Sequence, residues 1–433
     1  MFDQARIGLL EATLAGLESS LREFMPDGVQ RDFYLWAISP QNPHQNEFLQ
    51  ATGVLQLINL TVMLLEGLVD SYQWPQLAMC SVPINVYQSL EIVSDNLAIG
   101  LVRLGREQRT PQHELLYRFN HFMVERLKGN EAAVVELLRP LRPFASGVSS
   151  FDQSLNRAKR LKCAEAYLEM RRDVSLDELE YDLWPLLVAN VETCAALADV
   201  VDGYATGSLV REGLLDRYQA VNRTLEARHM SLLELANVGA HSILVIPSLG
   251  YLVAVLAEWI RPDDRYHLVL EDGTLIEALY SAALMIRLLN DLGGGLLSQT
   301  EAQRRLMLDT LLRTYERNMD TLNTISLLLL SYVDESDHLS RIHKDLFYGE
   351  FNIAVYNLRH IQAVPDAIQV FGNNVTYFAR LYREQAARLD ELLQCIAQRL
   401  MDKTISRLIQ RFVEFHAKLY SNRYTDVAGE YAI

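Results

Sequence analysis

The sequence is poor in the residues that would mark a disulfide-stapled, zinc-binding or nucleic-acid-binding protein. Only four cysteines occur in 433 residues, and they lie far apart without a Cys-x-x-Cys pair. This spacing excludes a zinc ribbon, and free thiols in a reducing compartment are expected. Basic residues are also scarce, because 40 Lys and Arg stand against 55 Asp and Glu and leave a net charge of -15. Such a balance argues against binding to a nucleic-acid backbone.

Long uninterrupted apolar runs are missing as well. The best candidate, Ile243 to Ala257, is interrupted by Pro247 and Gly250. It is shorter than the roughly 20 residues that cross a bilayer, so a buried helix is expected and no transmembrane segment. The N-terminus lacks the basic start and apolar run of a signal peptide, and a cytoplasmic location is therefore expected.

Strand-like alternation is absent too, and apolar residues recur at the three- and four-residue spacing of helices. The pattern predicts an all-α fold of about a dozen helices, which is more than a four-helix bundle holds. The expected helices cover residues 3–24, 46–72, 87–106, 111–128, 151–172, 176–205, 208–229, 231–260 with a kink at Pro247, and 272–298, followed by three or four more.

Residues 139–150 are rich in Pro, Gly and Ser and are the best candidate for a linker. They divide the chain into an N-terminal helical region, residues 1–145, and a second region, residues 146–433.

The most unusual stretch is the helix expected over 272–298. Arg287, Asn290 and Asp291 lie within about one turn of it among apolar residues, and three glycines follow at 293–295. Polar groups on a buried helix either satisfy one another or line a cavity. The glycines favour a cavity, because each costs about 1 kcal/mol in a helix and is tolerated mainly where the backbone approaches something closely.

A second candidate site is the pair Asp199 and Asp202. Carboxylates three residues apart on a helix face the same side, a geometry that suits Mg²⁺. The alternative is a helix end with two ordinary surface acids before Gly203.

Together these segments resemble the class I terpene synthases. The family ends one helix with Asp-Asp-x-x-Asp, and Ala198-Asp199-Val-Val-Asp202 matches it at two of three acids. Its second motif is Asn-Asp-x-x-Ser/Thr-x-x-x-Glu, often led by Arg-Leu-Leu. Arg287-Leu-Leu-Asn290-Asp291 matches this start, whereas Gly294 stands at the Ser/Thr position, as in kaurene-synthase-like enzymes, and Ser298 stands at the Glu position.

The resemblance covers about residues 150 to 433 and implies a large antiparallel helical bundle of the class I terpenoid synthase type, with extra N-terminal helices. It implies Mg²⁺ as cofactor and a prenyl diphosphate as substrate. The implied metal ligands are Asp199, Asp202, Asn290, Asp291 and Ser298. Arg287 would donate to the diphosphate, and Arg423 and Tyr424 resemble the Arg-Tyr pair that closes over it in bacterial members.

Further features of the family find counterparts here. Ser231 to Gly250 resembles its kinked helix, with the break at Pro247 to Gly250. Aromatic side chains that could line a dry pocket and stabilise a carbocation are Tyr204, Tyr251, Trp259 and Tyr280.

Some assignments stay open at this point. The acidic motif could instead be Glu66 with Asp70, or Asp152. Because Ser298 replaces a carboxylate, Glu301 could substitute for it if the helix continues through the glycines.

The resemblance implies a terpene synthase acting on geranylgeranyl diphosphate or a bicyclic C20 diphosphate. The class II motif Asp-x-Asp-Asp is missing, so a separate class II cyclase would supply a bicyclic substrate, and a homodimer is compatible with the family. Two alternatives remain, a chain-elongating prenyltransferase and a non-catalytic helical scaffold whose buried polar residues satisfy one another.

Overall fold

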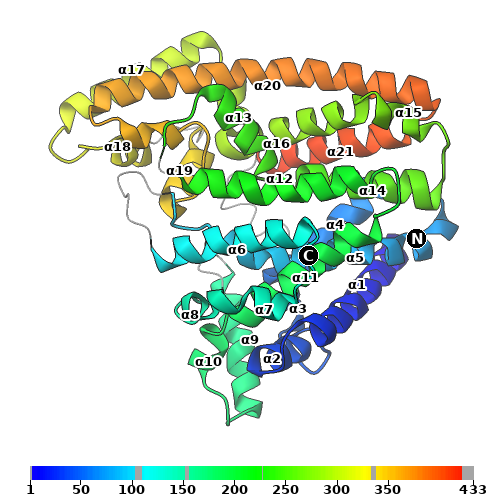
Figure 1. Ribbon diagram of the computed structural model, residues 1–433. Helices are drawn as coiled ribbons and strands as arrows, with labels where there is room; N and C mark the ends of the chain where they lie inside the picture. The colour runs from blue at the N-terminus through cyan, green and yellow to red at the C-terminus, as the bar shows by residue number, and fades with distance from the viewer. Residues whose placement is uncertain (1, 103–109, 152–155, 227, 333–337, 422–433) are drawn as a thin grey trace. The chain divides into compact units, whose positions relative to one another are not determined.

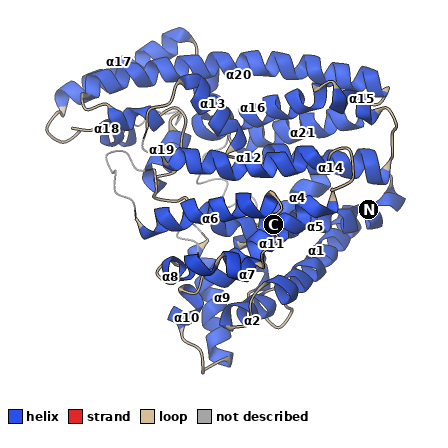
Figure 2. Cartoon of the chain, in the orientation of Figure 1, coloured by secondary structure: helices blue, strands red, loops and turns tan. Residues whose placement is uncertain are grey.

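The computed structural model describes residues 2–102, 110–151, 156–226, 228–332 and 338–421. Every regular element in these ranges is a helix, and they contain no strand (Figure 2). The expected all-α class is therefore confirmed, while the terpenoid synthase type of bundle stays a prediction.

The chain divides into two compact units. The first unit comprises Met1–Ala98, Arg109–Gln219 and Pro247–His267, and the second comprises Ile99–Gln108, Ala220–Ile246 and Leu268–Ile433. Most of residues 146–219 thus pack in the same unit as the N-terminal helices, and the border between the units falls inside α12.

The helices of the first unit are mostly short apart from α1, α5, α6, α9 and α11. They are α1 (Phe2–Phe24), α2 (Val29–Ala37), α3 (Gln45–Ala51), α4 (Val54–Leu65), η1 (Ser71–Gln73), α5 (Trp74–Leu97), α6 (Pro111–Leu127), α7 (Val134–Leu137), η2 (Arg139–Leu141), α8 (Arg142–Ala145), α9 (Arg157–Met170), α10 (Leu176–Glu180), α11 (Trp184–Val200), the first part of α12 (Gly207–Leu225), most of α14 (Val245–Ala254) and the π-helix η3 (Val255–Ile260).

The core of the first unit forms around α5, which packs against α1 and α11. Pro75 lies in the first turn of α5, where a helix has no use for the missing N–H. Leu77, Tyr87 and Leu90 of this helix are almost completely buried. Burial of such side chains is the main stabilising contribution, at about 1.5–3 kcal/mol each.

The second unit contains the longest helix of the chain. Its elements are the end of α12, α13 (Leu232–His241), the first two residues of α14, most of α15 (Tyr266–Glu271), α16 (Thr274–Ser298), α17 (Glu301–Arg317), α18 (Ile325–Ser331), α19 (Ser340–Tyr348), η4 (Tyr356–His360), α20 (Val364–Leu400) and α21 (Thr404–Leu419).

Helix α16 lies at the centre of this unit, where it packs against α20, α21, α13 and α19. In Figure 1 the long α20 runs beside α16 and α17. The neighbours on several sides explain why the residues of α16 are mostly buried, and they place its polar residues in the interior.

Several expected helices are broken into shorter ones. The helix expected over 46–72 is α3 and α4, because Gly53 has a φ of 75° and separates them. Trp74-Pro75, a sequence that can end a helix, begins α5 instead. Proline is tolerated in the first turn as well as just after a helix, so its position alone does not tell a start from a stop.

The kink expected at Pro247 is wrong in position. Helix α13 ends at His241 and α14 begins at Val245, so the break lies at residues 242–244. Pro247 is in the first turn of α14, where its ring does not disturb the hydrogen-bond ladder.

The linker expected over 139–150 is also wrong for its first half, which is helical in η2 and α8. In its second half the N–H of Ser150 donates to the carbonyl of Glu180 at 2.5 Å, and Oγ of Ser149 donates to Oε1 of Glu180 at 2.9 Å. These contacts hold the segment against α10 within the first unit.

One helical stretch of the described residues, Leu176–Val200, is long and apolar enough to cross a membrane by length and composition. The number rises to three if each bent helix pair counts as one span, the pairs being Gln45–Ala51 with Val54–Leu65 and Leu232–His241 with Val245–Ile260. Of the apolar window in Leu176–Val200, 78% is buried inside the protein.

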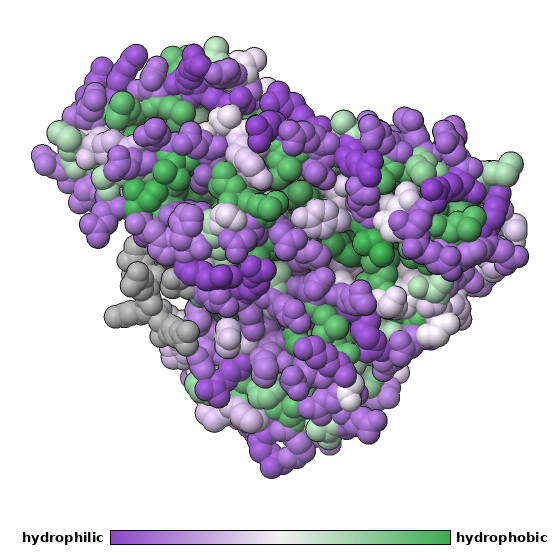
Figure 3. All heavy atoms as spheres, turned by 45° about the horizontal axis from the view of Figure 1, so that its top comes forward, coloured by the Kyte–Doolittle hydropathy of each residue, from purple (hydrophilic) through white to green (hydrophobic). Residues whose placement is uncertain are grey.

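On the face seen in Figure 3, hydrophilic residues predominate and hydrophobic ones form small separate groups.

Candidate functional site

Helix α16 carries the Arg-x-x-Asn-Asp motif on its second half. The helix begins after Gly273, and Oδ1 of Asp272 accepts the N–H of Thr274 at 2.9 Å. Gly293 has a φ of 76° and a ψ of 154°, so the helix is broken three residues after Asn290. The expected helix over 272–298 is confirmed in extent, but it is not continuous.

The glycine run is a place where other segments approach α16. A Cβ atom on Gly293 would lie 3.2 Å from Cγ of Arg341, and one on Gly295 would lie 3.4 Å from Cδ2 of His338. The positive φ of Gly293 and the close contacts at Gly293 and Gly295 explain two of the three glycines by packing alone.

Replacement of Gly293 by alanine is expected to lower the free energy of unfolding by about 1–3 kcal/mol. A left-handed φ costs an L-residue roughly 1–2 kcal/mol, and the new methyl group would press on Arg341. Chemical denaturation of purified protein measures the loss. The matched control is Gly8→Ala in α1, where a Cβ meets nothing within 4 Å, and which should be neutral or stabilising. Equal effects of the two substitutions would contradict the explanation.

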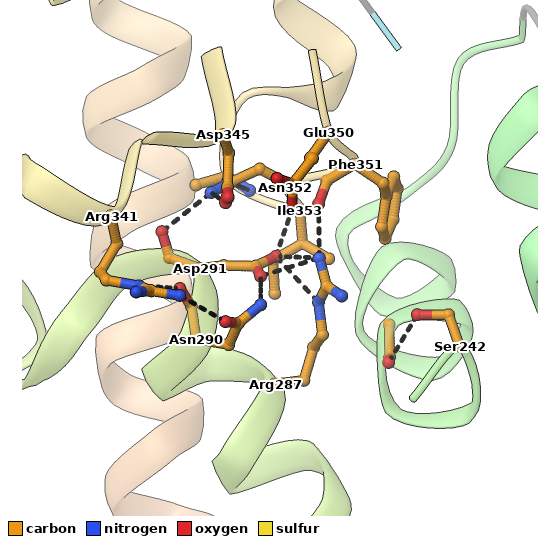
Figure 4. A network of polar contacts seen from close by, with 12 residues as sticks. Ser242, Arg287, Asn290, Asp291, Arg341, Asp345, Glu350, Phe351, Asn352 and Ile353 are labelled. Atoms are coloured by element: carbon orange, nitrogen blue, oxygen red, sulfur yellow. Dashed lines mark hydrogen bonds and ion pairs between the residues drawn. The ribbon is translucent and has the colours of Figure 1, made fainter. Parts of the chain in front are cut away.

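Arg287 and Asp291 lie one turn apart and form a two-pronged ion pair (Figure 4). Nε and Nη2 of Arg287 donate to Oδ2 of Asp291 at 3.0 and 2.9 Å, and Nη2 lies 2.8 Å from Oδ1. The same Nη2 donates to the carbonyl of Phe351 at 2.6 Å, and the Phe351 ring centroid lies 4.9 Å from the guanidinium carbon. The backbone N–H of Ile353 also donates to Oδ2 of Asp291, at 2.8 Å.

Asn290 joins this pair to a second arginine. Its Nδ2 donates to Oδ1 of Asp291 at 3.1 Å. Arg341 of α19 donates from Nη2 to the side-chain oxygen of Asn290 at 2.6 Å and from Nε to its carbonyl at 2.8 Å. The guanidinium of Arg341 also lies over the Tyr420 ring, 4.8 Å from its centroid.

Residues after Arg341 complete the network, and the sequence motifs did not reveal them. Nδ2 of Asn352 donates to the carbonyl of Asp291 at 2.8 Å and to Oδ2 of Asp345 at 2.7 Å. Nζ of Lys344 lies 3.2 Å from Oδ1 of Asp345 and 2.5 Å from Oε2 of Glu350. The only sequence signal was the density of polar residues between positions 341 and 352.

Burial changes the acidity of these groups. Asp291 and Asp345 are at most 1% exposed. Burial, with repulsion from Asp345, raises the pKa of Asp291 to about 6, although Arg287 opposes the rise. Burial likewise raises the pKa of Glu350 against the attraction of Lys344. For Lys344 itself, burial disfavours the charge, but Asp345 and Glu350 together outweigh it and raise the pKa.

Each member of the Arg287, Asn290 and Asp291 trio therefore has protein partners inside the second unit (Figure 4). The side-chain oxygen of Asn290, which the resemblance assigns to a metal, accepts from Arg341. Of the two explanations that the sequence left open, mutual satisfaction is the one realised in these contacts. A metal role for Asn290 or Asp291 requires their contacts to open, and it stays a prediction.

The last implied ligand of this motif lies beyond the helix break. Ser298 is exposed at the end of α16, and its Oγ donates to the carbonyl of Gly295 at 3.0 Å. Glu301 belongs to α17, a separate helix capped by Thr300. The idea that Glu301 continues the face of Asn290 is therefore wrong, because the helix ends between them.

Asp199 is in the last turn of α11 in the first unit, whereas Asp202 lies in the turn that follows the helix end at Val200, so the helix expected over 176–205 stops before the second acid. Nη2 of Arg211 lies 2.9 Å from Oδ1 of Asp199 and 3.1 Å from Oδ2 of Asp202, so the two carboxylates do face one side. Both side chains are 64% exposed. They line a cavity of about 430 Å³, and Arg126 and Lys128 also lie in its wall.

The other acids proposed for the metal motif have separate positions. Glu66 follows the last residue of α4, and Asp70 caps η1 and lies 2.9 Å from Nη2 of Arg261. Both belong to the first unit, whereas Asn290 belongs to the second. Asp152, Arg423 and Tyr424 lie outside the described residues.

Three of the four aromatic residues expected to line a pocket do lie together in the first unit. The Trp259 ring is 5.4 Å from that of Tyr204 and 5.7 Å from that of Tyr251, between centroids. Tyr251 is fully buried and donates to the carbonyl of Cys80 at 2.6 Å. Tyr280 lies in the second unit beside His241. Their role toward a carbocation stays a prediction.

The first unit contains a second buried charge network, which no sequence motif indicated. Glu91 of α5 is 1% exposed and accepts from Tyr218 at 2.6 Å and from Asn190 at 3.0 Å. Nη2 of Arg217 lies 3.4 Å from Glu91 and 2.5 Å from Asp95. Burial raises the pKa of Glu91, although the attraction of Arg217 opposes the rise. No local motif marks this network, because its members come from three helices.

Among the described residues, no three His, Cys, Asp or Glu side chains form a group arranged to hold a metal ion. Comparison of the chain with models of known families, with curated proteins and with solved structures found no match. The functional argument therefore depends on the residues of this chain.

Proposed function

We propose that this protein is a Mg²⁺-dependent enzyme of the class I terpene synthase kind, acting on a C20 prenyl diphosphate. The observation that carries the proposal is the pair of exposed carboxylates, Asp199 and Asp202, side by side on a cavity wall with basic residues. Mg²⁺ typically binds one or two carboxylates and takes its other ligands from phosphate and water. The sequence resemblance of Arg287-Leu-Leu-Asn290-Asp291 adds the enzyme class.

The chemistry is the cleavage of one carbon–oxygen bond. The electrons of that bond leave with the diphosphate, whose charge Mg²⁺ and arginine neutralise as it develops. The allylic cation that remains loses a proton after any ring closure, which gives a hydrocarbon. Aromatic rings are suited to stabilise a cation in a dry environment, and of the clustered rings Tyr251 is fully buried whereas Tyr204 is exposed.

The test is the release of inorganic diphosphate from geranylgeranyl diphosphate and from a copalyl-type diphosphate, with and without Mg²⁺. We expect release to require Mg²⁺ and to fall at least about 100-fold in Asp199→Asn/Asp202→Asn, since the loss of a residue that only supports a metal ligand already costs 10- to 100-fold. Asp173→Asn, an exposed acid paired with Arg171, is the control and should not change the rate. Absence of release from every prenyl diphosphate would refute the enzyme.

The same assay separates the related alternative. A chain-elongating prenyltransferase would consume isopentenyl diphosphate together with an allylic diphosphate and give a longer diphosphate. Product analysis by mass spectrometry distinguishes a hydrocarbon from a longer prenyl diphosphate.

A second candidate function is a non-catalytic helical scaffold, and a specific observation favours it. Arg287, Asn290 and Asp291 bind one another and the residues around Arg341 in a buried network. If this is their whole role, Asn290→Ala should lower stability by about 1–3 kcal/mol, because Arg341 loses a buried acceptor. The enzyme proposal instead expects Asn290→Ala to reduce diphosphate release by more than any loss of folded protein explains.

A further inference from the structure

Glu91 of α5 lies in the interior of the first unit and accepts hydrogen bonds from three helices. Oγ of Ser94 donates to its Oε1 at 2.6 Å, and the hydroxyl of Tyr218 and Nδ2 of Asn190 donate to its Oε2 at 2.6 and 3.0 Å. Its only cation among the described residues is Arg217, whose Nη2 lies 3.4 Å from Oε1. An ionised carboxylate accepts and does not donate, so this arrangement is that of the ionised acid.

Arg217 is divided between this buried acid and an acid at the surface. The same Nη2 lies 2.5 Å from Oδ1 of Asp95, which is one turn after Glu91 on α5. The side chain of Asp95 is 56% exposed, whereas that of Glu91 is 1% exposed. The shorter contact is with the surface acid, so Arg217 has a partner that does not depend on Glu91.

Beside Glu91 lies an acceptor that is not used. Nδ2 of Asn190 donates to Glu91 and, at 2.9 Å, to the carbonyl of Leu90. Oδ1 of Asn190 is buried and accepts no hydrogen bond from the described residues, which is a costly state for a buried polar atom. A neutral carboxyl has one O–H to donate, and it can pair with an amide through two hydrogen bonds, one in each direction. Oδ1 of Asn190 is the acceptor that such a pair needs.

We propose that the cluster around Glu91 is a pH-operated switch between two sets of contacts. At high pH the ionised Glu91 shares Arg217 with Asp95. At low pH Glu91 binds a proton from solvent, donates it in a hydrogen bond to Oδ1 of Asn190, and leaves Arg217 to Asp95. No covalent bond other than the new O–H forms, and none breaks within the protein.

The groups that set the switch come from three helices of the first unit. The titratable or charged side chains that face Glu91 are Tyr87 and Asp95 of α5, Cys194 of α11, and Arg217 and Tyr218 of α12. Helices α1, α4, α6, η1 and η3 also pack against α5. None of their described residues forms an ion pair or a hydrogen bond with Glu91.

Burial favours the neutral form of Glu91. It raises the pKa of this acid, Arg217 opposes the rise, and repulsion from Asp95 adds to it. The folded chain therefore binds this proton more tightly than the unfolded chain does. The contribution of Glu91 to stability is fully present below pH 4.5 and is lost as pH rises through the raised pKa. As pH falls, Arg217 thus exchanges its contacts within a folded protein.

The test follows Arg217 and Glu91 separately in the full chain, from about pH 8 down to pH 4.5. Nuclear magnetic resonance of the side-chain N–H groups of Arg217, assigned through its backbone, reports the partners of the guanidinium. Infrared spectroscopy reports the C=O band of a neutral buried carboxyl. We expect the two signals to change together as one proton is bound, and both changes to be lost in Glu91→Gln.

Two further variants separate the switch from simple protonation of a buried acid. Asp95→Asn removes both a repelling charge and the second partner of Arg217, so the change in the two signals should move to lower pH. Glu180→Gln replaces another buried acid of the first unit and is the matched control. It should leave the pH dependence of Arg217 unchanged.

An Arg217 signal that stays constant while Glu91 is protonated would overturn the switch, because the guanidinium would then have kept its partners. A full response to pH in Glu91→Gln, or an unmoved response in Asp95→Asn, would also count against it. If Glu91→Gln does not fold, the Arg217 signal of the unchanged protein still decides the question.

Discussion

Replacement of Arg287 by methionine is expected to lower the free energy of unfolding by about 3–5 kcal/mol at pH 7. The substitution leaves the carboxylate of Asp291, which is 0% exposed, without its counter-charge, and breaking a buried ion pair from one side costs about this much. Urea unfolding followed by circular dichroism measures the loss. Arg388→Met is the matched control, because Arg388 also binds a carboxylate with two nitrogens but lies at the surface beside Glu277. We expect it to cost far less than Arg287→Met, because solvent screens an exposed ion pair.

The effect of Arg287→Met should depend on pH in a defined direction. In the unchanged protein the pKa of Asp291 is raised from 3.8 to about 6. The contribution of this group to the stability of the folded protein is therefore fully present below pH 3.8 and is lost as pH rises through 6. Removing Arg287 raises the pKa further. The penalty should therefore be largest at pH 7 and above and should shrink as pH falls toward 4. A penalty that is constant from pH 4 to 8 would contradict an electrostatic origin.

Replacement of Arg217 by methionine should have a similar effect in the first unit. Glu91 is 1% exposed and would keep its hydrogen bonds from Ser94, Tyr218 and Asn190 but lose its cation. We expect a loss of about 3–5 kcal/mol at pH 7. The pKa of Glu91 is already raised above 4.5 and rises further without Arg217, so the electrostatic penalty should be absent at pH 4.5, where the acid is neutral with or without the arginine, and should grow as pH rises past the raised pKa.

The control for Arg217→Met is Arg22→Met, which removes an exposed ion pair with Glu18 in the same unit. It should change stability by less than about 1 kcal/mol and show no such dependence on pH. If the two substitutions cost the same, burial of the Glu91 network would not be the source of its effect.

The polar trio on α16 illustrates how far local sequence reasoning reaches. Apolar residues at helical spacing predicted the helix and placed Arg287, Asn290 and Asp291 within about one turn, and the structure pairs Arg287 with Asp291. The partners from the other side could not be predicted, because Arg341 and Asn352 are about 50 and 60 residues later and no pattern links them to Asn290. Whether the trio lines a cavity or closes on itself depended on those partners.

The acids of α11 give the same lesson in the first unit. Their spacing on one expected helix predicted that Asp199 and Asp202 share a side, and Arg211 contacts both, although the helix ends at Val200 and Asp202 lies in the turn after it. Arg211 itself is on the next helix, and only the turn through Gly203, with a φ of 89°, brings it back toward them. A spacing rule along one helix contains no information about that turn.

Helix boundaries were the weakest part of the prediction. Gly53 breaks one expected helix because it adopts a φ of 75°, a conformation that glycine permits but does not require. The break after His241 has no comparable residue, and Pro247 drew the predicted kink to the wrong place. Such choices depend on packing against other helices, which a single segment does not encode.

The sequence by itself determined the helical class, the apolar face of each long helix and the position of the charged residues along them, because these follow from spacing and composition within one segment. The tertiary structure decided which charges meet. It closed Arg287, Asn290 and Asp291 into a network with Arg341, and it left Asp199 and Asp202 exposed beside Arg211 at a cavity. The physical reason is that the energy of a charge depends on its burial and its counter-ion, and both are properties of the packed chain.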